Sequence, residues 1–287
     1  MKNKLAIATR GGLGDCLMMT PAIKSLKLSN PGKELWVFCI VQAHYEILLD
    51  NIYIDCLLAG ENGIKIMQDN FPDGAIIYCN PPDLFPSLNN IQKRYSEIYC
   101  DMFKTPFLGD NLQLFISTNE ENLFFKKGFI KGDQIITVNP TSRCSKNQEW
   151  DWKKWEYLVR KFSNYKFIQI GLKEEKLING AIDYRGKLTL RESCLAVKNS
   201  ILYIGVDSFF SHVASAFNTN SITLFGDSSP NIYSHDNSSH ICKAFSCSPC
   251  NELLNGRECP YNIKCMNSIT ENEVEKVMRK KLENDGY

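Results

Sequence analysis

The sequence predicts an α/β protein made of two Rossmann-like halves. Short apolar runs rich in Val, Ile and Phe alternate with longer segments of helical period, as strands and crossover helices do in a parallel sheet. The runs expected to be strands are residues 4–9, 34–40, 54–58, 75–78, 134–138, 166–170, 201–206 and 221–225. The rhythm restarts after a polar, glycine-containing stretch at residues 126–133, where we expect a domain boundary. The length of 287 residues also favours two domains of roughly 100 to 150 residues each.

The composition excludes several classes of protein. The chain has 33 Lys and Arg against 32 Asp and Glu, a net charge of +1, so it has no broad positive field and we expect no nucleic-acid partner. Its longest apolar run, residues 35–41, is far shorter than the roughly 20 residues that cross a bilayer. The apolar run at residues 5–8 is too short for a secretory signal. We expect a cytoplasmic protein, with peripheral attachment to the inner face of the cytoplasmic membrane left open.

A glycine-rich loop at residues 10–15 follows the first expected strand. Glycines there let the backbone turn tightly and approach a ligand, and the next helix points its free N–H groups at the carboxyl edge of the sheet. The glycine spacing matches neither the dinucleotide fingerprint nor the Walker pattern. Asp15 beside the positive end of a helix suits a general base, and simple capping of the helix is an equal alternative. Thr20 and Pro21 should kink this helix or delay its proper start.

A second polar loop, residues 139–146, follows the first strand of the second half. Its hydroxyls and two cations at the carboxyl end of a strand suit an anion such as a diphosphate. Lys146 would act there as a point charge and Arg143 as a forked donor. A solvated turn without a ligand is the alternative.

A third loop, residues 205–212, joins an apolar strand to a helix. Ser208 can cap this helix and leave its first amides free to hold a phosphate. His212 lies one turn on, on the same face, and is a candidate contact. A single histidine in a helix is, however, more often a packed or hydrogen-bonded structural residue.

The cysteines divide into two groups. Eight of the twelve are scattered, several within apolar runs where thiols pack as small hydrophobes. The other four form a C-x2-C-x8-C-x5-C array that is typical of a closed structural site for zinc or iron: Cys247, Cys250, Cys259 and Cys265. Two disulfides or four free thiols are the alternatives, and His235 and His240 are substitute ligands for one cysteine. Four protein ligands would leave no open position for substrate, so we expect no catalytic role for this metal.

The end of the chain predicts a helix. Thr270 and Glu273 form a capping box, and Val274, Met278 and Leu282 fall on one face. We expect this helix to pack back on the first domain.

Taken together, these segments resemble glycosyltransferase family nine, the ADP-heptose-dependent heptosyltransferases of lipopolysaccharide and related glycan assembly. The resemblance spans nearly the whole chain. Three segments are similar to the family's N-terminal signature, phosphate loop and C-terminal nucleotide motif, in that order: residues 12–15 with 20–22, residues 141–146, and residues 206–216 with 224–226. The cysteine array with Met266 is similar to a segment of some members, including relatives that glycosylate proteins and carry iron there.

The resemblance implies the GT-B architecture, in which two Rossmann-like domains have a cleft between them and a C-terminal crossover helix. An N-terminal acceptor domain would occupy residues 1–130. A nucleotide-sugar domain would occupy residues 131–268 and include the cysteine knuckle at 247–265, and the terminal helix would occupy residues 269–287.

The resemblance also implies inverting sugar transfer without a catalytic metal. By position, Asp15 becomes the base that deprotonates the acceptor hydroxyl and Lys146 holds the donor phosphates. Glu175 corresponds to a ribose-binding carboxylate and Leu188 to a backbone contact with the base. The full set of candidate substrate-binding residues is Gly12, Leu13, Gly14, Thr141, Ser142, Arg143, Glu175, Leu188, Asp207, Ser208, Phe209 and His212.

The implied partners are a nucleotide sugar, ADP-heptose by resemblance, and a glycan, lipid-linked or protein acceptor; an oligomer is left open. Residues 71–133 are compressed relative to the family, so we expect a reduced or altered acceptor site. Two alternatives stay open: the same fold using another nucleotide sugar, and a non-catalytic sugar-nucleotide-binding or assembly protein.

Overall fold

The computed structural model describes residues 3–72, 76–79, 93–129, 132–250 and 258–284. The chain splits into two compact units, Met1–Ser117 and Thr118–Tyr287. The boundary therefore falls before α7 (Thr118–Phe125), and not at residue 130 as expected. The reason is that α7 packs within the second unit, where fully buried Phe124 stacks on Phe129 at 4.1 Å between ring centroids. An ion pair of 2.5 Å between Glu120 and Arg191 fastens α7 to the same unit.

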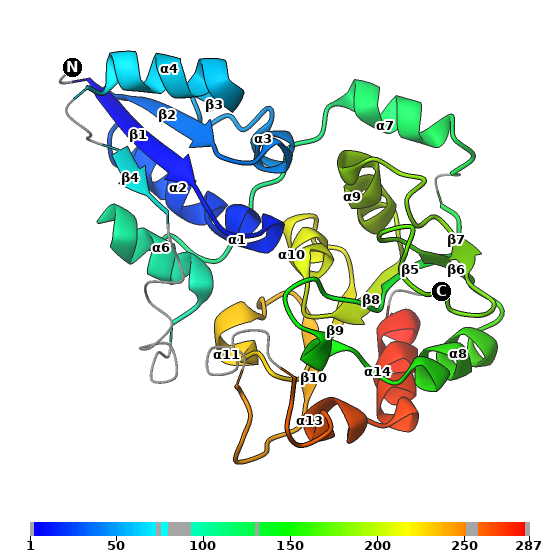
Figure 1. Ribbon diagram of the computed structural model, residues 1–287. Coiled ribbons are helices and arrows are strands. Elements are labelled where there is room, and N and C mark those ends of the chain that lie inside the picture. Colours follow the sequence, from blue (N-terminus) through cyan, green and yellow to red (C-terminus); the bar gives the residue numbers. More distant parts are fainter. Residues whose placement is uncertain (1–2, 73–75, 80–92, 130–131, 251–257, 285–287) are drawn as a thin grey trace. The chain divides into compact units, whose positions relative to one another are not determined.

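The first unit is a four-stranded sheet with strand order β3-β2-β1-β4, and all of its pairings are parallel. The strands are β1 (Lys4–Thr9), β2 (Glu34–Cys39), β3 (Cys56–Ala59) and β4 (Ile76–Tyr78). The helices are α1 (Leu13–Met18), α2 (Thr20–Leu28), α3 (Gln42–Leu48), α4 (Gly60–Asn70) and α6 (Tyr95–Phe103). Helix α4 lies on one side of the sheet, and α2 and α6 lie on the other (Figure 1).

The alternation of side chains along β2 explains why both faces of this sheet are covered. Leu35 and Val37 are fully buried, whereas Trp36 and Phe38, which alternate with them, pack with Met67 of α4. Because successive side chains point to opposite faces of a strand, each face of β2 needs its own layer of helices.

Helices α1 and α2 are separated at Met19, so the predicted interruption is confirmed. Pro21 occupies the first turn of α2, where its missing N–H costs nothing. The Thr20 hydroxyl donates to the Leu17 carbonyl at 2.7 Å and satisfies a group that the end of α1 leaves open.

The second unit is a six-stranded sheet with order β10-β9-β8-β5-β6-β7, again paired in parallel throughout. Its strands are β5 (Ile135–Asn139), β6 (Lys166–Gln169), β7 (Ile182–Asp183), β8 (Leu202–Val206), β9 (Ser221–Phe225) and β10 (Ser239–Cys242). All eight predicted strands are present in the two sheets. The two that the sequence did not predict, β7 and β10, are short edge strands with partly exposed side chains.

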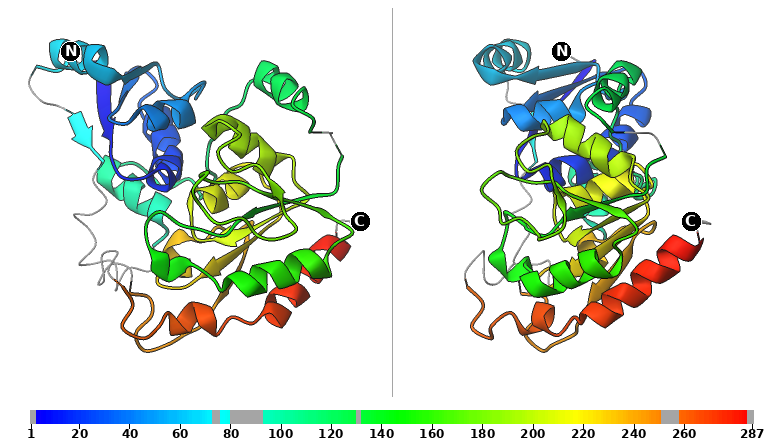
Figure 2. Two further views of the ribbon diagram at one scale, coloured as in Figure 1. Left: turned by 45° about the vertical axis from the view of Figure 1, so that its right-hand side comes forward. Right: turned by 90° about the vertical axis from the view of Figure 1, so that its right-hand side faces the viewer.

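Two layers of helices cover this sheet, α8 with α14 on one face and α9 with α10 on the other (Figures 1 and 2). The helical segments are the one-turn 3-10 helix η2 (Lys146–Gln148), α8 (Trp152–Lys161), α9 (Leu190–Lys198), α10 (Phe209–Ala216), α11 (Pro230–Tyr233), α13 (Lys264–Asn267) and α14 (Glu271–Asn284). The α/β class with two Rossmann-like units is therefore confirmed.

The C-terminal helix forms as predicted but packs in a different place. The Thr270 N–H donates to Glu273 Oε2 at 2.9 Å, which completes the capping box. Val274, Met278 and Leu282 are buried in one core with α8 and the strands of the second unit. We expected these side chains to pack on the first domain. They are instead buried in the core of the second unit, so that prediction of where the helix packs is corrected.

Across the residues that the structure describes, no helix is both long and apolar enough to cross a bilayer.

Candidate functional site

The strand orders place the candidate loops at topological switch points. In the first unit the chain adds β2 and β3 on one side of β1 and then crosses to add β4 on the other side, so the strand order reverses between β1 and β4. In the second unit the order reverses in the same way between β5 and β8. Ligands of doubly wound sheets bind where this happens, outside the carboxyl ends of the strands. The glycine-rich loop follows β1, and the loops with Lys146 and Ser208 follow β5 and β8.

The glycine-rich loop wraps around the Asp15 carboxylate. Gly11 has φ +87°, and a Cβ at this position would lie 2.5 Å from Asp15 Oδ2, so only glycine fits. The Gly12 N–H donates to the same oxygen at 2.6 Å. Leu13 and Gly14 form the first turn of α1 together with Asp15. One carboxylate oxygen therefore caps the helix, as the alternative interpretation expected.

The surroundings of Asp15 also favour proton transfer. Burial raises the pKa of this carboxyl, while hydrogen bonds from the Gly12 N–H and the Tyr95 side chain lower it, with a net shift upward. A carboxylate with a raised pKa is a stronger base than an exposed aspartate. Capping and basicity are compatible here.

A histidine that the sequence did not single out lies beneath this loop. His44 of α3 is buried, and its Nδ1 is 2.8 Å from the Thr9 hydroxyl at the end of β1. Burial lowers the pKa of His44, and hydrogen bonds to the backbone of Gly11 and Gly12 oppose that shift. His44 therefore supports the turn that holds Asp15. No local pattern in the sequence distinguishes it from an ordinary helical histidine.

The loop after β5 is anchored at its base and exposed at its cations. Asn147 and Gln148 are buried, and the Ser145 hydroxyl accepts from the Asn147 N–H at 3.1 Å. Arg143 and Lys146 are exposed. Thr141 and Ser142 are half-buried between them and the strand. The loop is therefore anchored by its buried residues and presents Arg143 and Lys146 to solvent.

The loop after β8 is tied to the loop after β5 across the switch point. The Ser208 hydroxyl donates to Asn139 Oδ1 at 2.9 Å, and Asn139 is the last residue of β5. Asp207 is buried and accepts from the Ser228 hydroxyl at 2.6 Å. Ser208 occupies the N-cap of α10, and half-buried Phe209 begins the helix. The sequence placed Asn139 and Ser228 at strand ends but gave no sign of these bridges.

His212 is placed away from any ligand role. It is buried, and its Nδ1 lies 2.8 Å from Nε2 of His235, with the rings edge to face. Burial and the neighbouring His235 hold the pKa of His212 well below its usual value. The structural interpretation is thus the one that fits, and His212 leaves the set of substrate contacts. His235 is likewise engaged in this pair, and His240 lies against the Phe225 ring.

Glu175 lies at the same carboxyl edge, in the loop after β6. Gly171 has φ +139°, and a Cβ there would clash with the Glu175 carboxylate. Glu175 Oε2 is buried without a hydrogen-bond partner. Burial raises the pKa of Glu149. The charge of Lys146 lowers this pKa and the charge of Glu175 raises it, so Glu149, Lys146 and Glu175 lie near one another. Leu188 is half-buried in the turn before α9.

The four clustered cysteines are free thiols in the structure, and the charges of Cys265, Cys259 and Cys247 act on Cys250, so they lie near one another. Burial raises the pKa of Cys250 to about 12, with further increases from Asp227, Cys265, Cys259 and Cys247. Within the described ranges, no three His, Cys, Asp or Glu side chains are placed to hold a metal ion together.

Thiols are suitable ligands for zinc or iron, but the structure does not bring these four into a coordinating arrangement. Asp227 is 1% exposed; burial raises the pKa of its carboxyl, and the side chains of Ser145, Gln148 and Asn147 lie close enough to lower it in part. Asp227 lies close enough to Cys250 and Cys265 to raise the pKa of both thiols. Because burial raises the pKa of Asp227 and of both thiols, their neutral forms are favoured, and the group does not by itself require a bound cation.

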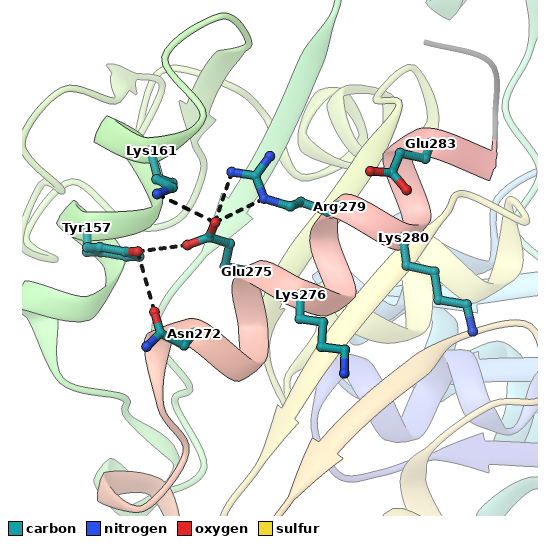
Figure 3. A pocket seen from close by; sticks show the side chains of 8 residues that line it. All are labelled: Tyr157, Lys161, Asn272, Glu275, Lys276, Arg279, Lys280 and Glu283. Carbon is teal, nitrogen blue, oxygen red and sulfur yellow. Dashed lines mark hydrogen bonds and ion pairs between the residues drawn. The ribbon is translucent and has the colours of Figure 1, made fainter.

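One surface pocket of about 520 Å³ lies apart from these loops. Residues of α8 and α14 line this pocket (Figure 3). Glu275 at its centre accepts a hydrogen bond from the Tyr157 hydroxyl at 2.7 Å and forms an ion pair with Arg279 at 2.9 Å. Tyr157 and Lys161 lie in the second half of α8, toward the amino edge of the sheet. The Glu275 carboxylate is already satisfied, so the pocket offers little to a ligand.

Comparison with known proteins agrees with this arrangement. A family model described as glycosyltransferase family 9 (heptosyltransferase) matches residues 113–259, just over half of the chain. No curated protein sequence matches the chain.

Several solved structures share the fold over nearly the whole chain. A glycosyl transferase family 9 structure from Veillonella parvula DSM 2008 has 16% identity and a TM-score of 0.75, with 98% of this chain and 97% of that chain covered. ADP-heptose lps heptosyltransferase II of E. coli has 14% identity and a TM-score of 0.75, with coverage of 99% and 100%. TibC, an iron-containing dodecameric glycosyltransferase from enterotoxigenic E. coli H10407, has 15% identity and a TM-score of 0.74, with coverage of 98% and 76%. TibC has also been solved in complex with ADP-D-beta-D-heptose.

The family match extends from before α7 to Cys259, so it includes the loops that hold Lys146, Glu175 and Ser208. The solved relatives have the GT-B fold, and the two parallel sheets match it over their full length. The chain therefore belongs to glycosyltransferase family 9 and is a glycosyltransferase.

Proposed function

We propose that the chain transfers a heptose from ADP-heptose, with inversion at the anomeric carbon, to a hydroxyl of a glycan, lipopolysaccharide core or protein acceptor. The observation that carries this proposal is the loop after β5, where exposed Lys146 stands on a buried turn and Asn139 accepts from Ser208 at the N-cap of α10. Solved relatives that are named for ADP-heptose, or hold it, support the choice of donor.

Departure of a nucleoside diphosphate requires positive charge where the leaving group forms. Lys146, Arg143 and the N-terminus of α10 supply it, and the half-buried hydroxyls of Thr141 and Ser142 add hydrogen bonds. Glu175 Oε2, buried without a partner, is available to accept from the ribose hydroxyls. Asp207 acts indirectly, since Ser228 occupies one of its oxygens.

Attack on the anomeric carbon requires removal of a proton from the acceptor hydroxyl. We assign that step to Asp15, whose raised pKa strengthens it as a base and whose orientation is fixed by the Gly12 N–H. Gly12, Leu13 and Gly14 hold the carboxylate in place and present the start of α1 to the acceptor.

The four cysteines are proposed to hold a structural zinc or iron ion. Such an ion, when bound, would cross-link the residues on either side of 251–257 and neutralise the buried negative charge there. It would take no part in sugar transfer, since its coordination would be filled by the protein.

The proposal is tested first by ligand binding. Thermal-shift measurements with ADP, UDP and GDP should show stabilisation by ADP above that by the other two nucleotides. Lys146→Ala should weaken ADP binding roughly 10- to 100-fold, the range for loss of a charge-assisted hydrogen bond. Lys276→Ala, which removes an exposed cation on α14, is the matched control. Equal shifts with all three nucleotides would refute the choice of donor.

Turnover tests the assigned base. Asp15→Asn should reduce kcat with ADP-heptose roughly 10²- to 10⁴-fold and leave ADP affinity unchanged. An Asp15→Asn variant with normal turnover would show that another group removes the proton. Binding of ADP without transfer to any acceptor would favour a sugar-nucleotide binder over an enzyme acting on these substrates.

A further inference from the structure

A buried tyrosine of β8 lies on the side of the sheet that α9 and α10 cover. Tyr203 has no exposed surface. Leu202, Ile204 and Val206 belong to the core that the strands share with α8 and α14. Because successive side chains of a strand point to opposite faces, Tyr203 and Gly205 both face the other layer of helices.

Gly205 makes room for the end of the Tyr203 side chain. A Cβ on Gly205 would lie 2.8 Å from Tyr203 Cζ and would clash with the hydroxyl oxygen. The same Cβ would lie 2.7 Å from the carbonyl oxygen of Asn139, with which Gly205 is paired in the sheet. The Tyr203 side chain therefore runs along β8 over Gly205, toward the carboxyl end of the strand, where Asn139 ends β5.

The Tyr203 hydroxyl comes close to Ser208 at the N-cap of α10. Burial raises the pKa of Tyr203, and the Ser208 side chain lies close enough to lower that pKa in part. Among the described residues, no atom meets the Tyr203 hydroxyl in full hydrogen-bonding geometry. A buried hydroxyl without a complete hydrogen bond is costly, so a phenol kept at this place, where phenylalanine would fill the same space, indicates a use for its O–H group.

The Ser208 hydroxyl has one proton to donate and two acceptor sites. The proton goes to Asn139 Oδ1 at 2.9 Å. The Ser211 N–H, which an N-cap serine can also cap with its side chain, donates to the Ser208 carbonyl at 3.0 Å. Ser208 Oγ is therefore available to accept a hydrogen bond from Tyr203.

An N-cap serine has a choice of partners that matters for an anion site. Its oxygen ordinarily accepts from the N–H groups of the first turn of its helix. The proposed donor site offers these same N–H groups of α10 to the diphosphate. A Ser208 side chain turned toward α10 would thus compete with the ligand for them.

We propose that Tyr203 is a positioning residue of the donor site. In the donor complex its hydroxyl donates to Ser208 Oγ, and with Asn139 it holds the serine side chain away from the first N–H groups of α10, which then bind the diphosphate without competition. This inference rests on the proposed role of the N-terminus of α10 in donor binding. A serine whose proton and oxygen both have partners beneath the helix gains little by capping it.

The first test is Tyr203→Phe, which removes only the hydroxyl. Calorimetry on the full-length chain should show ADP affinity reduced roughly two- to tenfold, the range for one hydrogen bond. The urea midpoint of unfolding without ligand should not fall, since the hydroxyl is not fully bonded there. Tyr99→Phe, the same change at a fully buried tyrosine of the first unit, is the matched control and should leave ADP affinity unchanged. A lower midpoint with unchanged ADP affinity would indicate a packing role alone and overturn the inference.

The second test asks whether Tyr203 acts through Ser208. Ser208→Ala removes the hydroxyl that Tyr203 is proposed to hold, so adding Tyr203→Phe to this variant should have little further effect on ADP affinity. An equal loss of affinity in the presence and absence of the Ser208 hydroxyl would contradict the proposed contact. Circular dichroism confirms that each variant is folded.

Lys146→Ala separates the inference from the function beneath it. If this variant binds ADP normally, the proposed donor site fails and the role of Tyr203 fails with it. If Lys146→Ala weakens ADP binding and Tyr203→Phe does not, the inference alone is overturned.

Discussion

Replacement of Gly11 by alanine is the sharpest test of how the first unit holds Asp15. The new Cβ would lie 2.5 Å from Asp15 Oδ2 and 2.9 Å from its Cγ, well inside van der Waals contact. The backbone φ of +87° adds a conformational cost of about 1–2 kcal/mol for an L-residue. The carboxylate must move by roughly an ångström to relieve the contact, and misplacement of that size costs on the order of 10²-fold in rate.

The assay compares neighbouring glycines. Gly11→Ala should lower the free energy of unfolding by about 1–2 kcal/mol or more and reduce kcat about 10²-fold, with ADP affinity unchanged because the proposed donor site lies in the other unit. Gly12→Ala should be much milder, since its Cβ would lie 3.5 Å from Asp15 Oδ2. Gly32→Ala, whose Cβ would contact nothing within 4 Å, is the neutral control. A folded Gly11→Ala enzyme with full kcat would refute the argument that the carboxylate must sit where the loop holds it.

Three further predictions follow from groups described above. The base must be ionised, and the pKa of Asp15 is raised from 3.8, so the rate should fall as the pH drops through a value above the pKa of an ordinary aspartate. The pH profile of kcat/KM checks this. Asp15→Asn should lack the acidic limb of that profile. Lys243 and the Thr270 N–H lower the pKa of Glu273 from 4.5 to about 2, so its stabilisation is present above pH 4.5 and is lost as pH falls toward 2. With the carboxylate 41% exposed, Glu273→Gln should cost at most ~1 kcal/mol at pH 7 and less at pH 3 in urea unfolding, with Glu271→Gln as the control. Asn139→Ala removes the acceptor of the Ser208 hydroxyl and should weaken ADP binding roughly two- to tenfold, whereas an unchanged dissociation constant would show that the bridge does not order the donor site.

Local patterns in the sequence were enough to predict the two sheets. The strands of the cores, such as Ile135–Asn139 and Leu202–Val206, are buried throughout and mostly apolar because helices cover both faces, and that composition is visible without any structure. The capping box of α14 and the break before α2 are likewise local, because the interacting groups lie within four residues of one another.

The parts that were not predicted depend on partners distant in the sequence. The apolar face of α14 predicts that this helix packs against another surface, but not against which one. In the structure it packs within the second unit, against Trp155 and Leu158. His212 has the same local appearance in a binding site and in a buried pair, and only the position of His235 decides between them. The sequence also gave no sign of the hydrogen bond from the Cys259 N–H to Asn147 Oδ1, because the two residues lie far apart in the chain and share no periodic pattern.

The position of α7 has a practical consequence for dissecting the protein. A fragment that starts at residue 118 would retain Phe124 on Phe129 and Glu120 on Arg191, whereas one that starts at residue 131 would remove these aromatic and ionic contacts and uncover α9. Since α14 is also buried in this unit, the longer fragment contains every layer that its sheet requires. Excision at residue 118 thus offers a route to nucleotide titrations by NMR on about 170 residues, free of the first unit.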